Sequence, residues 1–520
     1  MTTTTPPSPT QADAASLHEN PHLVQRLGLF SSTAIVVGSM IGSGIFVVPA
    51  EISRGVGSPA LLIGAWLVTA VMTIIGALSY GELAAMMPKA GGQYVYLREA
   101  LGPMWGFLFG WTLFLVIQTG TIAAVAVAFG KFLGVFFPVI SSSHWLLHFG
   151  HVPPIKLGPM VLGNMDIGLN TANLTGIIIV LVLTGINILG VRLGALVQNV
   201  FTTAKTAALL GLVVVGFLFG RNPAAMAANF GHNFWQGASW HALHPVQVGV
   251  GGPIAMVGLL AVLAVVQTGS LFSADAWNNV TFTAGEIKNP KRNLPLSLVL
   301  GTVIVISLFV AANFVYLMVL PLQGDPHGAT VLARGIQYAA EDRVATAVLE
   351  QIFKNAGAFL MAGAILISTF GCANGLILAG ARVYYAMSRD GLFFKSTSKL
   401  HPRYKTPVAA LVIQAVWTCV LCLTGSYSQL LDYIICTELI FYILTIACLF
   451  VLRRRQPDAE RPYRAVGYPV LPAIYIGMAA WICVVLLRYK PQFTWPGLLI
   501  VLLGIPVFAV WSRRGQAVAD

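Results

Sequence analysis

Long stretches without a charged residue are the feature that most constrains how this chain folds. A helix that crosses a lipid bilayer needs about 20 consecutive apolar residues, because the hydrocarbon core is about 30 Å thick. Nine windows of at least that length contain no Asp, Glu, Lys or Arg, and three further windows contain one or two. In chain order the twelve windows are 27–50, 55–81, 100–130, 167–191, 193–220, 253–285, 293–324, 355–381, 406–431, 432–452, 465–487 and 491–512.

The composition places the chain in the membrane class. Hydrophobic residues make up 57% of its 520 residues and charged residues only 9%, whereas soluble domains average about 25% charged residues. We therefore predict an all-α integral membrane protein with twelve spanning helices. Residues 1–26 are predicted to be a disordered tail without the features of a signal peptide, and residues 514–520 form a short C-terminal tail.

The basic residues indicate how the helices are oriented. Lys and Arg number 30 against 18 Asp and Glu, a net charge of +12, which in a soluble chain would suggest nucleic-acid binding. Sorted by predicted loop, 20 of them fall on the side of the N-terminus, nine on the opposite side, and Lys205 within a span. Because positive charge collects on the cytoplasmic side, we expect a plasma (inner) membrane protein with both termini in the cytoplasm and no nucleic-acid partner.

Two predicted spans are interrupted at matching positions. Gly38, Gly42, Ser43 and Gly44 break the first span near its midpoint. The sixth span reads QTGSLFSADAWNN over residues 267–279, a polar interruption that contains an aspartate. Close packing of small residues is the alternative explanation of the glycines. The second break makes a pair of broken helices the better explanation.

Five spans separate the two breaks, which is the offset of an inverted repeat. Transporters built in this way bind their substrate at broken helices near the middle of the membrane. We therefore predict a five-plus-five inverted repeat, with residues 27–220 as the first half and residues 253–453 as the second. Two further helices occupy residues 465–513.

An unwound segment at the first break suits an α-amino acid. The N–H groups of Ser43, Gly44 and Ile45 would open a half-helix whose positive end attracts a carboxylate. The carbonyl groups that end the preceding half-helix, including that of Ile41, would accept hydrogen bonds from an ammonium group. The carbonyl groups of residues 271–273 would do the same at the second break. The substrate is therefore expected to be a small zwitterion, and no cofactor is expected.

Lys205 lies deep within the fifth span. It is 13 residues from Arg192 and 16 from Arg221, or about 20 Å from either end at 1.5 Å per residue. A lysine near the midplane costs about 2.5–3.5 kcal/mol on insertion scales and should face a partner inside the bundle. Its ammonium would take the place of a coupling cation or carry a proton during transport; a purely structural role is the alternative.

Few acidic residues lie within the predicted spans. Asp275 precedes Ala276 and is either the N-cap of the second half-helix or a contact for the substrate amine. Glu438 in the tenth span and Asp432 near its outer end are the other intramembrane acids. Either is a candidate proton site, and Asp432 would otherwise be interfacial.

Cysteine and histidine residues give weak signals. All six cysteines fall inside predicted spans, so we expect no extracellular disulfide. The spacing of His144, His148 and His151 would place three imidazoles on one helical face, as for a metal or a pH sensor. No cysteine or carboxylate completes such a set in the sequence, so we predict no metal site.

Four sequence motifs carry a family resemblance. They are GSMIGSGIFVVP (38–49), FSADAWNNVTFTAGEIKNPKRNLP (272–295), FGCANGLILAGARVYYAMSRDG (370–391) and LRRRQPDAERPYR (452–464). In this order they resemble the amino acid–polyamine–organocation superfamily, and most closely its L-type amino-acid transporter branch. The resemblance covers about residues 27–487 and implies an inverted-repeat fold of twelve helices that works by alternating access.

The resemblance also implies roles for particular residues. Ser43 and Gly44 match the carboxylate-binding amides, and Phe272 matches the aromatic gate over the substrate; Ser273, which follows it, is a candidate contact through its carbonyl group. Lys205 falls where sodium-independent members keep a lysine. In the eighth helix, Ser368 and Thr369 match hydroxyls that sodium-coupled relatives use, and Asn374 falls in the stretch that faces the substrate.

Two departures from the family pattern bear on partner and substrate. Eukaryotic L-type members join an ancillary glycoprotein through a cysteine after helix 3, and residues 136–170 contain none, so no disulfide-linked ancillary subunit is expected. The chain thus resembles the stand-alone prokaryotic members. Those members usually have glycines where this chain has Asp275 and Ala276, which leaves the size and charge of the substrate open.

The leading hypothesis is sodium-independent transport of neutral L-amino acids by exchange. The alternatives are a carrier of cationic amino acids or polyamines, with Asp275 as counter-charge, and a proton-coupled symporter that uses Lys205 or Glu438. A non-transporting amino-acid sensor would need an output domain, and an enzyme would need a paired acid and base or a metal cluster. No Walker motif for ATP-driven pumping occurs either.

Overall fold

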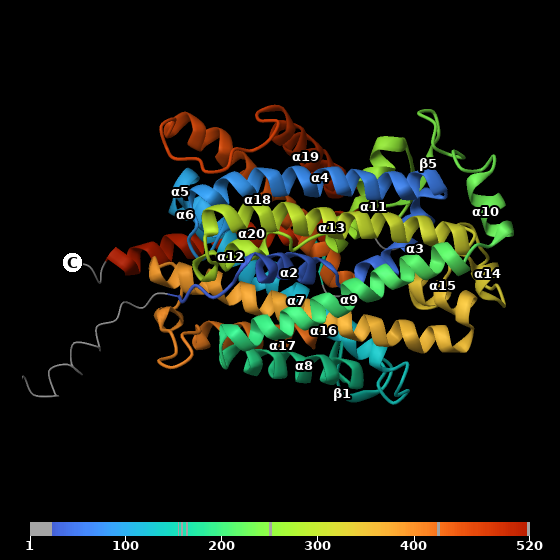
Figure 1. Ribbon diagram of the computed structural model, residues 1–520, viewed down its shortest axis with the longest axis horizontal. Helices are drawn as coiled ribbons and strands as arrows, with labels where there is room; N and C mark the ends of the chain where they lie inside the picture. Colours follow the sequence, from blue (N-terminus) through green and yellow to red (C-terminus); the bar gives the residue numbers. More distant parts are fainter. Residues whose placement is uncertain are drawn as a thin grey trace, which may run out of the picture.

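Long helices that run side by side form a single bundle (Figure 1). The computed structural model describes residues 23–153, 155–157, 160–162, 165–248, 252–423 and 427–516. Within this part, ten helices are long and apolar enough to cross a membrane. Two shorter apolar helices, α11 (Leu259–Ser273) and α17 (Val408–Cys422), lie in the two remaining predicted windows. The predicted helical membrane protein is therefore confirmed.

The other helices at the predicted spans have the following bounds. They are α2 (Leu29–Met40) with α3 (Gly44–Val56), α4 (Pro59–Met86), α6 (Pro103–Thr112) with α7 (Gln118–Leu133), α8 (Thr171–Ile188), α9 (Val191–Phe219), α12 (Asn279–Phe282), α13 (Pro290–Val319), α16 (Asn355–Arg389), α18 (Tyr427–Arg455), α19 (Val470–Tyr489) and α20 (Pro491–Gln516). A π-helical turn at Leu113–Ile117 joins α6 to α7. Shorter helices lie between them: α5 (Gln93–Leu101), α10 (Pro223–Phe230), α14 (Val331–Arg334) and α15 (Val344–Phe353).

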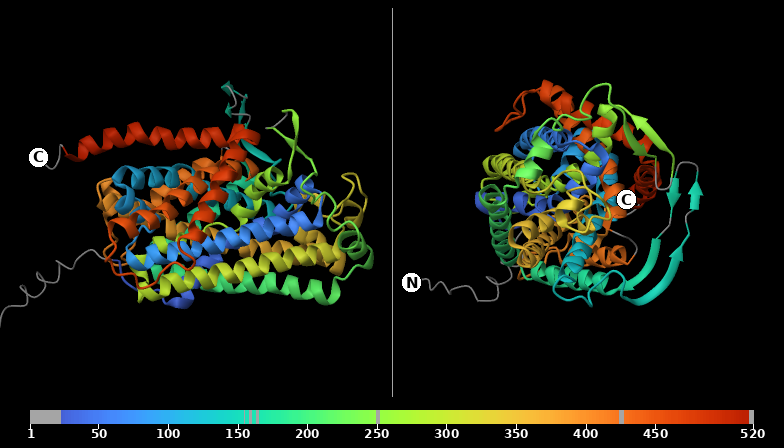
Figure 2. Two further views of the ribbon diagram at one scale, coloured as in Figure 1. Left: turned by 90° about the horizontal axis from the view of Figure 1, so that it is seen from above. Right: turned by 90° about the vertical axis from the view of Figure 1, so that its right-hand side faces the viewer.

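The broken first helix and the third helix lie at the centre of the bundle. In the most apolar part of Leu29–Val56, 83% of the residues are buried, and in that of Pro103–Leu133, 78% are buried. The corresponding value for Thr494–Ser512 in α20 is only 22%, and α20 lies along the outside of the bundle in Figure 2. The breaks predicted from the sequence are thus surrounded by other helices.

Three small antiparallel sheets depart from the all-α prediction. β1 (Trp145–Val152) pairs with β4 (Met165–Asn170), β2 (Ile155–Leu157) with β3 (Met160–Leu162), and β5 (His244–Gln247) with β6 (Ile254–Val257). They lie in the loops that join spans 3 to 4 and 5 to 6. Residues of β4 and β6 were expected to begin helices, and their strand pairing moves the starts of α8 and α11 to Thr171 and Leu259.

The boundary between spans 9 and 10 also differs from the expected one. α17 ends at Cys422, and α18 already begins at Tyr427. The predicted boundary between the windows 406–431 and 432–452 therefore lies too far toward the C-terminus. Of the predicted tails at 1–26 and 514–520, residues 1–22 and 517–520 lie outside the described residues. Residues 514–516 belong to α20 and not to a tail. Asp432 lies within α18.

Both described chain ends lie at the same end of the bundle, which we call the termini end (Figure 1). It holds the start of α2 and the end of α20. Here the backbone of Leu27 pairs with that of Ile287, and the amides of Arg26 and Leu27 both donate to the Glu286 carbonyl oxygen. The segment that precedes the first helix is therefore fastened to the segment that follows the broken sixth helix.

A buried ion pair supports this connection from the eighth helix. Arg382 of α16 donates from Nη2 and Nε to the two carboxylate oxygens of Glu286, at 3.1 and 3.2 Å. The side chains are 0% and 1% exposed. Because a buried charge is costly unless it is paired, this contact fixes the end of α16 against the residues that follow α12.

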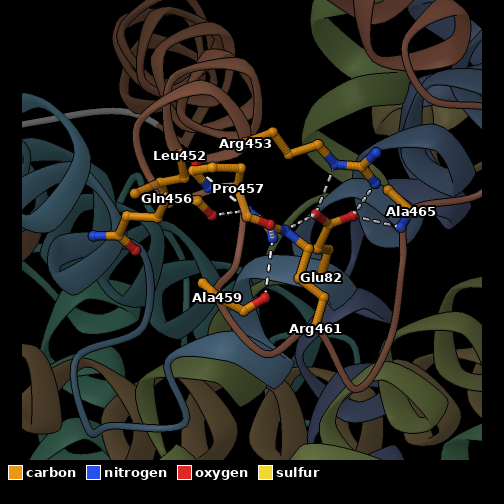
Figure 3. A network of polar contacts seen from close by, with 8 residues as sticks. All are labelled: Glu82, Leu452, Arg453, Gln456, Pro457, Ala459, Arg461 and Ala465. Atoms are coloured by element: carbon orange, nitrogen blue, oxygen red, sulfur yellow. Dashed lines mark hydrogen bonds and ion pairs between the residues drawn. The ribbon is translucent and has the colours of Figure 1, made fainter.

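A second carboxylate at the termini end joins α4 to α18 (Figure 3). Glu82 is fully buried and accepts hydrogen bonds from Arg453 Nε and Nη2, at 2.9 and 2.7 Å, and from the backbone amide of Ala465, at 2.6 Å. Arg461 Nε lies 3.3 Å from the same carboxylate. Arg461 also donates to carbonyl oxygens of the loop after α18, which are those of Leu452, Gln456, Pro457 and Ala459. Glu82 thus holds this loop in place.

Candidate substrate site

The first helix is broken where the glycine and serine pattern predicts. α2 ends at Met40, residues 41–43 leave the helical path, and α3 begins at Gly44. The amide groups of Gly44 and Ile45 open α3, so no carbonyl group within that helix accepts from them. Their position, with that of Ser43 just before them, fits the predicted carboxylate-binding end of a half-helix.

The sixth helix is broken at the matching place. α11 ends at Ser273, and α12 begins only at Asn279. Between them Ala276 has φ +62°, a left-handed conformation that ends a helix. Asp275 is not the N-cap of α12, since Asn278 holds that position and makes no side-chain cap. The capping role considered for Asp275 is therefore wrong.

The two breaks are in direct contact. A methyl group built on Gly44 would lie 2.2 Å from Ser273 Oγ and 3.0 Å from its Cα atom, so only glycine allows this approach. A cavity of about 20 Å³ lies beside the contact. It is lined by Ser39, Met40, Gly42, Ser43, Gly44, Thr121, Val125, Phe272, Ser273, Asp275, Ala276 and Cys372. Among the predicted substrate contacts, this places Ser43, Gly44, Phe272, Ser273 and Asp275 together.

Several lining residues were not predicted from the sequence. Thr121 and Val125 of α7 face the cavity, but they belong to an apolar helix in which nothing in the sequence distinguishes them from their neighbours. Thr121 Oγ1 donates to the Ile117 carbonyl oxygen at 2.6 Å, as threonines in membrane helices often do. Cys372 donates to the Ser39 carbonyl oxygen at 3.1 Å. These residues make the cavity wall that faces the two breaks.

Lys205 holds the carbonyl end of α2. Its side chain is 1% exposed, and Nζ donates to the carbonyl oxygens of Gly38 and Ile41 at 2.5 and 2.7 Å. The third hydrogen bond goes to the Ser368 carbonyl oxygen at 3.2 Å. The ammonium thus uses all three of its protons on backbone acceptors. The Ile41 carbonyl, expected to receive a substrate amine, is occupied by the chain's own cation.

Ser368 completes this arrangement, whereas its neighbour does not. Ser368 Oγ lies 3.0 Å from the carbonyl oxygens of both Ile41 and Gly42. Thr369 Oγ1 donates only to carbonyl groups of its own helix, those of Ile365 and Leu366. The structure therefore brings Lys205 and Ser368 together at the first break and leaves Thr369 outside.

Asn374 faces away from the cavity. Its amide nitrogen donates to the Gly194 carbonyl oxygen at 3.1 Å and to Gln198 Oε1 at 2.9 Å. Its oxygen accepts from Asn187 Nδ2 at 2.9 Å. Asn374 therefore joins α16 to α8 and α9, and it does not line the cavity at which it was predicted to contact the substrate.

Glu438 lies beside Asp275 and not beside Lys205. The hydroxyl group of Tyr442, one turn along α18, is 2.6 Å from Asp275 Oδ1 and 3.0 Å from Glu438 Oε1. Tyr442 was not predicted as a site residue, because nothing in the sequence pairs residue 442 with residue 275. Glu438 was predicted to lie at a coupling-cation site with Lys205. It instead forms a cluster with Asp275 and Tyr442.

Two of the three loop histidines lie on a strand rather than on the helical face considered from their spacing, and His144 precedes that strand. His148 and His151 belong to β1, and both imidazoles contact Asp166 Oδ1, at 3.5 and 3.1 Å. The hydrogen bond from His151 lowers the pKa of the Asp166 carboxyl group. No group of three metal-ligating side chains suited to a metal ion occurs in the described part of the chain.

A larger cavity opens at the termini end. It measures about 590 Å³ and is lined by residues of the segment before α2, of the loop after α4, of α5 and of the end of α16, including Lys89, Arg98 and Arg389. Ala90 and Gly285 also line it, and the adjacent Gly91 amide donates to the Phe282 carbonyl oxygen at 3.0 Å. The loop after α4 is thus closed against the second half of the broken sixth helix.

Sequence comparisons relate the chain to known proteins. The amino acid permease family matches residues 27–510. The large neutral amino acids transporter small subunit 2 of Mus musculus is 30% identical over 514 residues, which cover 98% of this chain and 86% of the relative. The serine/threonine exchanger SteT of Bacillus subtilis is 28% identical over 95% of this chain and 99% of its own length. The b(0,+)-type amino acid transporter 1 of Homo sapiens is 28% identical over 92% of this chain and 86% of the relative.

Proposed function

Because the chain belongs to the amino acid permease family, we propose that this multi-pass membrane transporter of amino acids exchanges neutral L-amino acids without sodium. The substrate would bind between the two broken helices, with its carboxylate at the amides of Ser43, Gly44 and Ile45. Transport involves no covalent step, so the protein would not be an enzyme. Its relatives include transporters of large neutral amino acids and a serine/threonine exchanger.

The observation that carries independence from sodium is the environment of Lys205. A hard cation at the first break would need the oxygen atoms that end α2. The Lys205 ammonium already binds the carbonyl groups of Gly38 and Ile41, and Ser368 also contacts Ile41. A fixed positive charge therefore stands where a coupling cation would bind.

The size of the cavity supports a mechanism with moving helices. A volume of about 20 Å³ is enough for about one water molecule and too small for any amino acid. The half-helices must therefore separate to admit the substrate, and they would close again around it. This is the behaviour expected of alternating access.

Transport by purified protein in liposomes tests the proposal. Vesicles loaded with unlabelled serine, alanine or leucine should take up the labelled amino acid in sodium-free buffer, and empty vesicles should take up much less. Vesicles without protein serve as the control for leak. Uptake that requires a sodium gradient, or that is equal in loaded and empty vesicles, would contradict sodium-independent exchange.

A carrier of cationic amino acids or polyamines is the second candidate. It is favoured by one observation: Asp275 lines the cavity, and Glu438 lies directly behind it. Competition of serine uptake by arginine, lysine and putrescine separates the two candidates. If the second is correct, Asp275→Asn should weaken inhibition by the cationic compounds and leave inhibition by alanine unchanged.

We further propose that the transporter works without a disulfide-linked partner, in the plasma membrane and with both termini in the cytoplasm. Residues 136–170 contain no cysteine, and 20 of 30 basic residues fall on the side of the termini. Purified protein should migrate identically on reducing and non-reducing gels and should transport without any second chain.

A further inference from the structure

A second small cavity lies behind the substrate cavity, and Asp275 lines both. It also measures about 20 Å³, room for about one water molecule. Glu438, Tyr442, Trp277 and Tyr475 line it together with apolar side chains of α4, α11 and α18. Two carboxyl groups therefore meet inside the bundle, one of them at the wall of the substrate site.

The hydrogen bonds of this cluster require an additional proton. The hydroxyl group of Tyr442 contacts both Asp275 Oδ1 and Glu438 Oε1, but a phenol has only one proton to donate, and ionised carboxylates only accept. Both carboxyl groups also line this second cavity. Glu438 Oε2 has no hydrogen-bond partner among the described residues. One proton on either acid turns the second tyrosine contact into a hydrogen bond.

The surroundings do not supply a positive charge in place of that proton. The titratable groups that face the pair from other elements are Tyr80 of α4, Tyr475 of α19 and Cys372 of α16, which are neutral near pH 7. Lys205 faces Cys372, but its protons are directed at the carbonyl end of α2. Asp275 and Glu438 are only 8% and 7% exposed. Two ionised carboxylates at this position would repel each other without solvent to screen them.

We propose that Asp275, Tyr442 and Glu438 form a proton-binding site, and that its one proton must be bound for a neutral amino acid to occupy the adjacent substrate cavity. A zwitterion brings no net charge to the site, so the proton remains necessary while a neutral substrate is bound. This inference rests on the proposed function for its substrate, but the proton site itself does not depend on transport.

The pH dependence follows from the protonation state that binds substrate. Exchange of a neutral amino acid should be constant at low pH and should fall once the shared proton dissociates, by about tenfold per pH unit above the midpoint for a single proton. Glu438→Gln replaces the acid by an amide that stays neutral and can donate a hydrogen bond. This variant should keep exchange at alkaline pH and lose the decline.

The first experiment measures serine exchange in proteoliposomes at equal internal and external pH, from pH 5 to pH 9. Wild type, Glu438→Gln and Glu51→Gln are compared, because Glu51 is an exposed carboxylate of α3 whose side chain is 59% exposed. The proposal expects the decline in wild type and Glu51→Gln and its loss in Glu438→Gln. A flat wild-type profile, or the same decline in all three proteins, would overturn it.

The second experiment detects the proton without transport. Infrared difference spectra of detergent-purified protein, wild type minus Glu438→Gln, should show the carbonyl band of a protonated carboxylic acid at neutral pH. The band should be absent from the corresponding difference with Glu51→Gln. Its absence for Glu438→Gln overturns the proton site, whereas a band without any serine exchange rejects the proposed function alone.

If Glu438→Gln does not fold, Tyr442→Phe should shift the pH at which the band disappears, and an unshifted pH would count against the cluster.

Discussion

At the scale of a single residue, Lys205 places a positive charge inside the bundle and also donates hydrogen bonds to the carbonyl groups at the break of the first helix. Without the ammonium, the carbonyl groups of Gly38, Ile41 and Ser368 would lose a partner. A buried acceptor left without a hydrogen bond costs about 1–3 kcal/mol. The broken helix is therefore expected to change its conformation when the lysine is removed.

We predict that Lys205→Ala lowers exchange by about tenfold or more, since each 1.4 kcal/mol of lost stabilisation corresponds to about a factor of ten. The variant should still purify as a single species, because deletion also removes the cost of burying a charge. Initial rates of counterflow, with Lys131→Ala at the end of α7 as the matched lysine control, check this. Normal exchange by Lys205→Ala would leave the lysine with a structural role only.

Neighbouring hydroxyl groups on α16 give a sharper comparison. Ser368 Oγ bonds to the carbonyl groups of Ile41 and Gly42, whereas Thr369 bonds only within its own helix. We predict that Ser368→Ala raises the KM for exchange about fivefold, the effect of one hydrogen bond worth about 1 kcal/mol. Thr369→Ala should leave it unchanged. An equal effect of both substitutions would show that the contact with the first break does not matter.

Lys205, Tyr442 and Thr121 show which site residues the sequence can predict and which it cannot. Lys205 was identifiable because a lysine 13 and 16 residues from the helix ends has to find a partner inside the protein. Its acceptors are backbone groups, which no sequence pattern distinguishes. Tyr442 and Thr121 escaped prediction for the same reason: their roles depend on which helix lies opposite them, and residues 275 and 442 are joined only by the fold.

At the scale of elements, the contact between the two broken helices depends on one missing side chain. Gly44 opens α3, and a methyl group there would lie 2.2 Å from Ser273 Oγ and 2.8 Å from its Cβ atom. Because the obstruction includes the Cα atom of Ser273 at 3.0 Å, a rotation of the serine side chain would not relieve it. The half-helices would have to move apart.

We predict that Gly44→Ala abolishes exchange while expression and size-exclusion behaviour are retained, since the clash is confined to the site. Gly64→Ala in α4 is the matched control, because nothing lies within 4 Å of the added methyl group. That substitution should leave exchange unchanged. Substantial exchange by Gly44→Ala would mean that the two breaks need not touch during transport.

The fastening of α16 to the segment after α12 gives a prediction on stability. Arg382→Ala leaves the Glu286 carboxylate buried and unpaired, which costs about 3–5 kcal/mol, so the apparent melting temperature in detergent should fall by several degrees. The double variant Glu286→Gln with Arg382→Met removes both charges and should recover most of the loss. Asp342→Asn is the control, because its pair with Arg54 is 39% and 34% exposed and such pairs contribute about 0–1 kcal/mol. A similar loss in all variants would contradict the argument from burial.

The elements themselves were largely predictable. Hydrophobic length placed the spans, and glycine with small polar residues marked both breaks. The errors lie where an apolar segment pairs as a strand, as at 254–257, because pairing depends on a distant partner. The sequence also could not show that the chain stays non-helical from Ala274 to Asn278, which is why Asp275 was considered as a helix cap.

At the scale of the whole molecule, the distribution of basic residues predicts how the bundle is oriented in the membrane. Both described chain ends lie at the termini end (Figure 1), where the buried acids Glu82 and Glu286 are held by arginines. Most of the basic residues were assigned to this side from the sequence alone. Since positively charged loops remain in the cytoplasm, the termini end should face the cell interior.

Labelling of single cysteines tests this orientation. Five of the described cysteines are buried, which are Cys372, Cys422, Cys436, Cys448 and Cys483, and Cys419 is half-buried within α17. The Cys419→Ser variant should therefore give little labelling, and the single cysteines are introduced into it. Ser396→Cys, exposed after α16 at the termini end, should react with a membrane-impermeant maleimide only in opened cells. Ser142→Cys, exposed before β1, should react in intact cells as well. The reverse pattern would place the termini outside the cell. It would show that the distribution of positive charge does not determine the orientation of this protein. Equal labelling of both positions in intact cells would mean that the membranes leak. Gln118→Cys is the control for labelling of buried positions: this residue is buried in α7, so it should stay unlabelled in either orientation.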